Sequence, residues 1–345
     1  PTVYTVDLRQ ELQEGNRSIF SRKLQELMTD RLNKGQQTIL FLNRRGYAGF
    51  VSCRSCGEVM KCPHCDVSLS EHKGGRLICH YFGYTQPMPK LCPKCGSKYI
   101  LGFKAGTQQI EEKLKELYPG VRTLRMDADT TRTKDSYEKI LSAFANGEAD
   151  VLIGTQMIVK GHDFPKVTLV GILAADLSLN ASDYRAGERT FQLLTQAVGR
   201  AGRGALPGEA VIQTYQPDHY AITCAAAQDY KSFYEEEILY RELSGYPPAA
   251  HMLAVQIYGK EEENVKQLAQ RLADVVKSNM DFLQILGPTP ANISKINDIY
   301  RYVFYAKHAE YDTLVAVKDC VEETLRQWQP RQLSIQFDFD PVNVL

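Results

Sequence analysis

The 345-residue sequence predicts an α/β protein: a parallel sheet covered by helices, interrupted by a cysteine-rich module and followed by a smaller α+β domain. Three observations predict this class. Short apolar segments alternate with amphipathic segments over most of the chain, as in doubly wound parallel sheets. Seven of the nine cysteines lie between Cys53 and Cys95. The final segment follows the order β-α-β-β-α-β, the split pattern of ferredoxin-like domains.

These patterns divide the chain. We expect residues 1–46 and 100–240 to form the parallel-sheet domain, 47–99 the inserted module and 241–345 the last domain. The net charge is zero, so nucleic-acid binding would depend on local patches. The sequence contains no run of 18 apolar residues, so it predicts no membrane-spanning helix. Clustered cysteines favour a metal site in a reducing compartment over a disulfide framework.

The parallel-sheet domain begins with apolar residues at helical spacing in Phe20–Leu32, followed by a nearly all-apolar strand, Thr38–Leu42. After the cysteines the pattern predicts, in order, strand Ile100–Phe103, helix Gln108–Leu117, strand Val121–Met126, helix Asp135–Asn146, strand Asp150–Gly154, strand Val167–Ala174, a helix from about Gly187, and strand Gly208–Thr214. Ligands of such sheets bind at the carboxyl ends of the strands, where we expect Gly154-Thr155 and Gly161–Asp163.

The segment Gln192–Gly204 has the spacing Q-x-x-G-R-x-x-R, formed by Gln196, Gly199, Arg200 and Arg203. Two arginines three residues apart would lie on one face of a helix. Their forked guanidinium groups suit a phosphate. The glycines would let a ligand or another backbone approach closely. Taken alone, the two arginines favour the simpler interpretation of solvated side chains at a helix end.

The cysteines predict structural zinc, because thiolates two residues apart can both reach one ion and two such pairs complete a tetrahedron. The candidate ligands are Cys53, Cys56, Cys62, Cys65, Cys79, Cys92 and Cys95. Two four-sulfur sites need eight thiolates, so one site has three sulfurs and a fourth position open to His80, His64 or water. An open zinc site could be catalytic, but no glutamate adjoins a ligand in the H-x-E arrangement of deaminases.

The cysteine-rich block is also mildly basic and rich in aromatic residues. Cations for phosphates and rings for bases are typical of single-strand binding surfaces. The alternative is a small module whose aromatic residues pack around zinc.

The last domain predicts strands and helices in the split order: strand His251–Tyr258, helix Glu261–Asn279, strand Leu283–Gly287, strand Tyr300–Lys307, helix Glu310–Trp328 and strand Gln332–Phe339. Pro288 and Pro290 are expected to end the second strand. The domain has no cluster of titratable residues typical of catalysis. Its polar residues Ser294, Lys295, Arg301 and Lys307 form a solvated face or touch a backbone phosphate.

Several of these segments resemble helicase motifs. Gln192–Gly204 is similar to motif VI of superfamily 2 helicases, and Ile153–Met157 with Lys160–Pro165 is similar to motif V. Thr38–Leu42 resembles the strand of motif IV, and a cysteine-rich insertion directly after it is particular to the PriA family of primosomal replication-restart helicases. Further similarity to this family lies in Arg125–Asp127 with Asp129-Thr130, Tyr184–Ala186 with Glu188-Arg189, and Asp338–Leu345.

The resemblance implies a RecA-like second helicase lobe, with ATP bound between it and a first lobe that supplies the P-loop and Mg²⁺. This sequence contains no G-x-x-x-x-G-K-[ST] motif, so we expect the carboxy-terminal half of such a protein, inactive alone. The implied roles are catalysis for Arg200, Arg203 and Gln196, ATP binding for Asp163 and Gly161, and DNA binding for Thr155, Gln156 and Lys160.

The family's eight-cysteine pattern implies two interleaved zinc sites. Carried over, the first comprises Cys53, Cys56, Cys92 and Cys95, and the second comprises Cys62, Cys65 and Cys79, with Phe82 at the usual fourth position. The implied partners are single-stranded and forked DNA, single-stranded-DNA-binding protein, primosome and helicase-loader proteins, and the first lobe, in the bacterial cytoplasm at the nucleoid. The alternatives are a non-enzymatic zinc-ribbon nucleic-acid-binding module, which leaves the Q-x-x-G-R-x-x-R segment unexplained, and a zinc hydrolase or deaminase.

Overall fold

The structure is a computed structural model that describes residues 1–42, 50–65, 67–72, 74–102, 106–127, 129–155 and 163–343. It separates into two compact units. The first, which we call the lobe unit, comprises Pro1–Val59, Pro89–Ala181 and Arg185–Tyr234. The second, the tail unit, comprises Met60–Met88, Ser182–Tyr184 and Glu235–Leu345. The cysteine-rich segment therefore contributes to both units, and the domain boundaries expected from the sequence stay a prediction.

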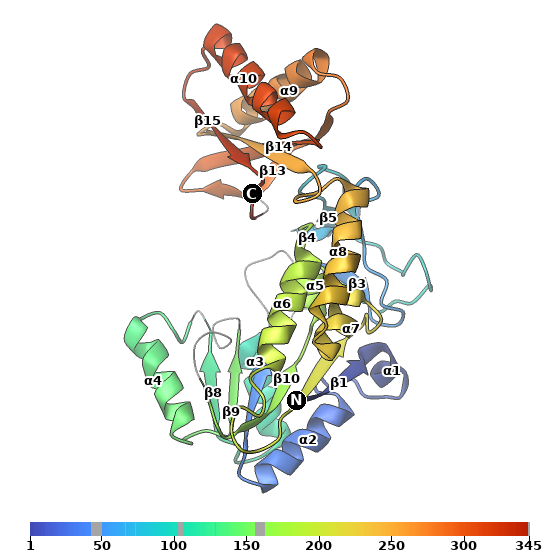
Figure 1. The fold of residues 1–345 in the computed structure, drawn as a ribbon, viewed down its shortest axis with the longest axis vertical. Helices are drawn as coiled ribbons and strands as arrows, with labels where there is room; N and C mark the ends of the chain where they lie inside the picture. Colours follow the sequence, from blue (N-terminus) through green and yellow to red (C-terminus); the bar gives the residue numbers. More distant parts are fainter. Residues whose placement is uncertain are drawn as a thin grey trace. The chain divides into compact units, whose positions relative to one another are not determined.

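The lobe unit is built on a six-stranded sheet in which every neighbouring pair is parallel (Figure 1). Its strands, in order across the sheet, are β1 (Thr2–Asp7), β11 (Glu209–Thr214), β10 (Val167–Ile172), β2 (Gln37–Phe41), β9 (Val151–Gly154) and β8 (Thr123–Met126). The central strands β10, β2 and β9 are buried along their whole length. The predicted parallel α/β sheet is thus confirmed.

Helices cover both faces of this sheet. One core contains apolar residues of α2 (Arg22–Asn33) and α3 (Thr107–Leu117). The other contains apolar residues of α4 (Lys134–Ala145), α6 (Ala186–Val198) and α7 (Tyr220–Ala227). The short helices α1 (Leu8–Gln13) and α5 (Asp176–Leu179) follow β1 and β10.

Two predictions about the sheet were wrong. Of the predicted strand Ile100–Phe103, the described residues do not join the sheet, because β7 (Ile100–Gly102) pairs antiparallel with β3 (Val51–Cys53) in a separate two-stranded sheet. The edge position is taken instead by β1, for which no strand was predicted. As an edge strand, β1 is only partly buried and has no continuous apolar run to indicate it.

The tail unit contains two sheets. A three-stranded antiparallel sheet within the cysteine-rich segment comprises β4 (Ser70–His72), β5 (Arg76–Ile78) and β6 (Thr85–Pro87). A four-stranded antiparallel sheet has the order β13 (Gln284–Ile296), β14 (Ile299–His308), β12 (His251–Gly259) and β15 (Leu333–Phe339). The helices α9 (Glu262–Asn279) and α10 (Tyr311–Trp328) pack on one face of the second sheet. The predicted β-α-β-β-α-β order is confirmed.

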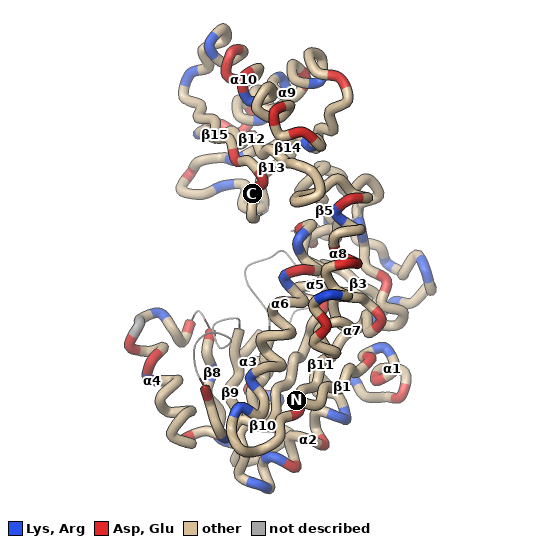
Figure 2. Tube along the Cα trace, in the orientation of Figure 1, with Lys and Arg blue, Asp and Glu red and all other residues tan. Residues whose placement is uncertain are grey.

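The helix α8 (Tyr230–Ser244), which was not predicted, contains the boundary between the units. Acidic and basic residues intermix along α9 and α10 (Figure 2), in agreement with the zero net charge. No helix within the described part of the chain is long and apolar enough to cross a membrane.

The second strand of the tail unit does not end at its prolines. β13 continues through Pro288 and Pro290 to Ile296, with irregular register against β14 after Leu286 and after Pro290. β13 lies at the edge of the sheet, where a proline that lacks an N–H need not break the hydrogen-bond ladder. The prediction failed because the sequence does not tell an edge strand from a central one.

Candidate functional site

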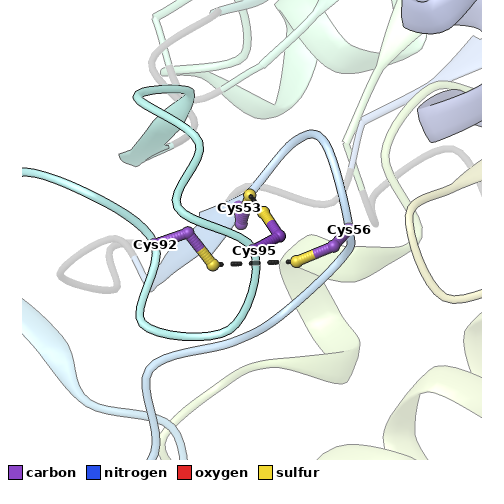
Figure 3. Close-up of side chains that lie close together, drawn as sticks. All are labelled: Cys53, Cys56, Cys92 and Cys95. Atoms are coloured by element: carbon purple, nitrogen blue, oxygen red, sulfur yellow. Dashed lines mark hydrogen bonds between the residues drawn. The ribbon is translucent and has the colours of Figure 1, made fainter.

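Four cysteines of the lobe unit form one candidate metal centre. The sulfurs of Cys53, Cys56, Cys92 and Cys95 all lie within 4.8 Å of one another. Their side chains converge on one point (Figure 3), with Sγ–Sγ distances of 3.6 Å between Cys53 and Cys95 and 3.7 Å between Cys56 and Cys92. Four sulfurs at about 2.3 Å from a zinc ion would be about 3.8 Å apart, so this donor set fits tetrahedral zinc.

The backbone around these cysteines explains the geometry. Cys53 accepts a backbone hydrogen bond from Gly57, and Cys92 accepts one from Gly96. Both glycines have positive φ, 79° for Gly57 and 71° for Gly96, which lets each loop turn its two sulfurs to one side. The hydroxyls of Ser55 and Ser97 lie 2.8 Å apart and join the two loops.

This four-sulfur centre is attached to the parallel sheet within the lobe unit. The Arg9 guanidinium donates to the carbonyl oxygen of Cys56 at 3.4 Å. A Cβ at Gly57 would meet the carbonyl oxygen of Tyr215 at 2.5 Å, so only glycine permits this approach. Arg9 follows β1 and Tyr215 follows β11, so the centre lies at the carboxyl ends of two neighbouring strands.

Three cysteines of the tail unit form a second candidate centre. The sulfurs of Cys62, Cys65 and Cys79 lie within 4.8 Å of one another, and Cys65 and Cys79 are 3.3 Å apart. In the described ranges no further histidine, cysteine or carboxylate ligand atom completes this group. Three sulfurs fit a zinc ion whose fourth ligand comes from elsewhere.

Phe82 occupies the position that a fourth cysteine would take. The Gly83 amide donates to the Cys79 carbonyl at 2.9 Å, and Gly83 has φ 77°, as in the loops of the four-sulfur centre. The Phe82 amide also donates to the Cys79 sulfur at 3.3 Å. The loop therefore keeps the backbone of a metal-binding turn, while the Phe82 ring is partly exposed at 39%.

Neither histidine considered from the sequence completes this centre. The His64 ring stacks on Phe82 with a centroid distance of 4.3 Å. The His80 Nε2 lies 3.0 Å from the His72 Nε2, and burial lowers the pKa of His80 to about 4. The structure thus brings together the three predicted sulfurs and no fourth protein ligand among the residues that it describes.

The two arginines converge on one carboxylate. Arg203 pairs with Asp163 through a short contact, and the Arg200 Nη1 lies 3.8 Å from the same Asp163 oxygen. Arg203 also donates to the Gly199 carbonyl at 2.8 Å. Burial and the neighbouring Arg203 cation lower the pKa of Arg200. Two guanidinium groups that lie together against an exposed carboxylate suit a further anion, such as a phosphate.

The predicted helical placement of the arginines was wrong. α6 ends at Val198, and Arg200 and Arg203 lie in the turn that follows. Gly202 in this turn has φ 72°, and a Cβ there would meet the Gly208 amide nitrogen at 2.4 Å. A positive φ is incompatible with a right-handed helix, so the backbone cannot continue as a helix through Gly202 to Arg203.

Asp163, which was expected at the carboxyl ends of the strands, instead lies with this turn near the amino end of β10. The Gly202 amide donates at 3.0 Å to Val167, the first residue of β10, so the turn lies at the amino end of that strand. A helix that follows a parallel strand runs back along the sheet, and α6 therefore ends at the edge opposite to the one where it begins. Gln196 is exposed on the last turn of α6.

Of the residues assigned to DNA, Thr155 lies directly after β9, at the carboxyl edge, where its amide donates to Met126 at 3.3 Å. This agrees with its predicted place. Gln156, Lys160 and Gly161 lie outside the described residues.

Sequence reasoning gave no role to the loop after β8, in which the structure shows several hydrogen bonds to the Asp127 carboxylate. The Asp127 carboxylate accepts from the Thr107 hydroxyl at 2.6 Å, the Asp129 amide at 3.0 Å and the Thr130 amide at 2.9 Å. Thr130 in turn donates to the Arg125 carbonyl. The sequence did contain an indication of this turn: Asp127 follows a predicted strand, and Thr130 comes three residues later, a pattern typical of turns capped by side chains.

Three protein-family models match the chain. They describe the primosomal protein N C-terminal domain over residues 242–342, the helicase conserved C-terminal domain over 91–205, and the PriA DNA helicase Cys-rich region domain over 62–87. The Cys-rich match contains all three cysteines of the second centre and supports zinc as its metal.

The chain is also similar to replication restart protein PriA from several bacteria. It is 46% identical to the Bacillus subtilis protein over 344 residues, which cover 99% of this chain and 43% of that protein. It is 43% identical to the Synechocystis protein over 350 residues, 100% of this chain and 42% of that protein. The Treponema pallidum protein is 35% identical over 347 residues, 100% of this chain and 52% of that protein. The chain thus spans about half the length of these relatives.

Proposed function

Since the chain belongs to the PriA family and corresponds to its carboxy-terminal half, we propose that it is the second motor lobe of an ATP-dependent 3′–5′ DNA helicase. In this proposal the helicase reloads the replisome at stalled forks, in the bacterial cytoplasm at the nucleoid. The observation that carries the proposal is the pair Arg200 and Arg203 on the exposed carboxylate of Asp163.

The pair is suited to a phosphate that carries growing negative charge. In the proposed reaction the first lobe provides a P-loop and Mg²⁺, and ATP binds between the lobes. Arg200 and Arg203 act as arginine fingers on the γ-phosphate, and Gln196 helps position it or the attacking water. Asp163 and Gly161 contact the nucleotide. The carboxylate keeps both guanidinium groups in place until a phosphate competes for them.

Thr155, at the opposite edge of the sheet, is assigned to DNA together with Gln156 and Lys160, which come after it in the sequence. Thr155, Gln156 and Lys160 follow β9 and would hydrogen-bond or pair with the strand backbone. The two cysteine centres are proposed to hold structural zinc and to support contacts with forked DNA. Single-stranded-DNA-binding protein, primosome and helicase-loader proteins are the proposed partners. Domain closure on ATP and opening after hydrolysis would then move the lobe along the strand.

The experiment compares Arg203→Ala with the unaltered sequence in the protein that carries this chain together with its first lobe. We expect DNA-stimulated ATP hydrolysis to fall about 10³-fold or more, because an arginine finger stabilises charge in the transition state. Affinity for forked DNA, measured by fluorescence anisotropy, should stay within a few-fold. The 345-residue chain alone should hydrolyse ATP no faster than background.

Arg132→Ala is the matched control, because Arg132 is exposed in the same unit and pairs with Asp129 at 3.4 Å. It should leave both activities unchanged. Equal losses of hydrolysis and DNA affinity in Arg203→Ala would assign Arg203 to DNA instead of phosphate. DNA binding without any ATP hydrolysis in the two-lobe protein would favour a non-enzymatic zinc-ribbon module.

A further inference from the structure

Lys307 is a buried cation in the tail unit, although the sequence placed it on a solvated face. Its side chain is only 5% exposed. The neighbouring β14 residues Phe304 and Ala306 belong to the core under α9 and α10. Because side chains alternate along a strand, Lys307 points to the opposite face of the sheet from Phe304 and Ala306.

The two described contacts of the Lys307 ammonium are with neutral groups. Its Nζ donates to the carbonyl oxygen of Ser244 at 2.8 Å and lies 3.8 Å from the centroid of the Tyr246 ring. Among the residues that the structure describes, no carboxylate oxygen lies within 4.0 Å of this nitrogen. A buried ammonium without a counter-charge is costly, and burial lowers the pKa of Lys307 to about 8.

The nearby negative charge comes from the three-sulfur centre. Burial is the larger effect on the pKa of Lys307, and a charged sulfur at Cys65 opposes it by raising that pKa. The Tyr246 ring, which Lys307 touches, lies against the Tyr81 ring, two residues after Cys79. Contacts place the loop after Cys79 on the same sheet. The Tyr81 ring lies 5.2 Å from Tyr305, two residues before Lys307, and 6.1 Å from Tyr246.

The charges of the centre explain why a cation is buried here. Three thiolates carry three negative charges, and a divalent zinc ion offsets two of them, which leaves one excess negative charge in a region of low polarity. We propose that Lys307 is the counter-charge of the three-sulfur metal centre, so that zinc affinity at this centre depends on a residue of the tail sheet. Lys307 is then a positioning and charge-compensating residue, since no described contact makes it a ligand.

The test uses the zinc-loaded 345-residue chain with Lys307 changed to Met, Gln or Arg. Native mass spectrometry counts zinc ions per chain while a chelator is titrated. We expect Lys307→Met and Lys307→Gln to weaken one zinc site 10- to 100-fold, the range typical of lost outer-shell partners, and to leave the other unchanged. Lys307→Arg keeps the charge and should stay near the original affinity. Gln can still donate to Ser244, so it separates charge from hydrogen bonding.

Two variants identify the affected site and its source of charge. Phe82→Cys supplies a fourth sulfur in a loop that already has the required backbone, so it should strengthen the same zinc site that Lys307→Met weakens. Asp66 follows Cys65 in the sequence and lies outside the described residues, and Asp66→Asn removes its carboxylate. It should leave zinc affinity unchanged, and an effect equal to that of Lys307→Met would overturn the proposal in favour of a Lys307–Asp66 pair.

A purely structural role gives a different result. If Lys307 only fills space, Lys307→Met lowers the melting temperature of the zinc-free and zinc-loaded chains equally. Zinc affinity then stays unchanged, because it depends on the difference in stability between the two forms, and both lose the same amount. That outcome would overturn the proposal. The proposal expects the rise in melting temperature on zinc loading to shrink in Lys307→Met and Lys307→Gln. The exposed Lys295→Met is the matched control and should change neither quantity.

Discussion

The pKa of a charged side chain in this protein depends on its burial, and that burial is set by residues far away in the sequence. Asp176 follows β10, and both of its carboxylate oxygens accept from the Tyr215 amide, at 3.1 and 3.2 Å. Its exposed fraction is 3%, and burial raises the pKa of Asp176 to about 6. The sequence near Asp176 contains nothing that predicts this, because Tyr215 arrives from the neighbouring strand β11. The spacing of Gln196, Arg200 and Arg203, in contrast, was visible in the sequence because the three lie within eight residues.

The raised pKa of Asp176 predicts a pH dependence of stability. Between about pH 4 and 6 the folded chain holds a proton that the unfolded chain has lost, so stability falls as pH rises through this window, by roughly 3 kcal/mol. In Asp176→Asn this fall should be absent, measured as the difference in urea unfolding free energy between variant and original chain at each pH. Asp150→Asn is the control of opposite sign: although partial burial opposes it, hydrogen bonding from Arg122 lowers the pKa of Asp150, so this variant should lose stability above pH 4. Parallel profiles for Asp176→Asn and the original chain would contradict the assignment.

At the scale of elements, the apolar strands and amphipathic helices were predictable because their patterns are local. What the sequence could not supply was the partner of each strand. Ile100–Gly102 looks like β9 in composition yet pairs with β3, and β13 passes through two prolines because it lies at an edge. The turn after α6 was missed for the same reason. Position 202 must be glycine because the Gly208 backbone packs against it, and Gly208 is held there by the start of β11.

The turn that carries the arginines therefore predicts a strong requirement for glycine. In Gly202→Ala the positive φ costs about 1–2 kcal/mol, and the Cβ would also overlap the Gly208 backbone, so we expect a total loss above about 2 kcal/mol. Gly120→Ala is the matched control: φ there is 84° with no atom within 4 Å, and it should cost only the conformational part. Chemical denaturation of both variants measures the difference. Equal losses would mean that the turn is not closely packed against Gly208.

At the scale of the whole molecule, each compact unit contains one cysteine centre. The loops of Cys53–Cys56 and Cys92–Cys95 enclose a segment that belongs to the tail unit, so the second centre is nested within the first in sequence but belongs to the other unit. The sequence grouped residues 47–99 as one module because the cysteines are close together along the chain. Which unit each centre supports depends on contacts such as Gly57 with Tyr215 and Tyr81 with Tyr305, which join residues far apart in sequence.

This division predicts that loss of one metal centre destabilises one unit. Cys95→Ser removes a sulfur from the four-sulfur centre, and hydrogen exchange should quicken in β1 and β11, because Arg9 and Tyr215 contact that centre from the ends of these strands. Cys79→Ser removes a sulfur from the three-sulfur centre and should quicken exchange in β13 and β14 instead, because the loop after Cys79 packs on them. Cys320→Ser, which alters a cysteine outside both centres, should leave both patterns unchanged. Faster exchange in both units from either centre would contradict the division, because it would mean that zinc stabilises the cysteine-rich segment as a single module.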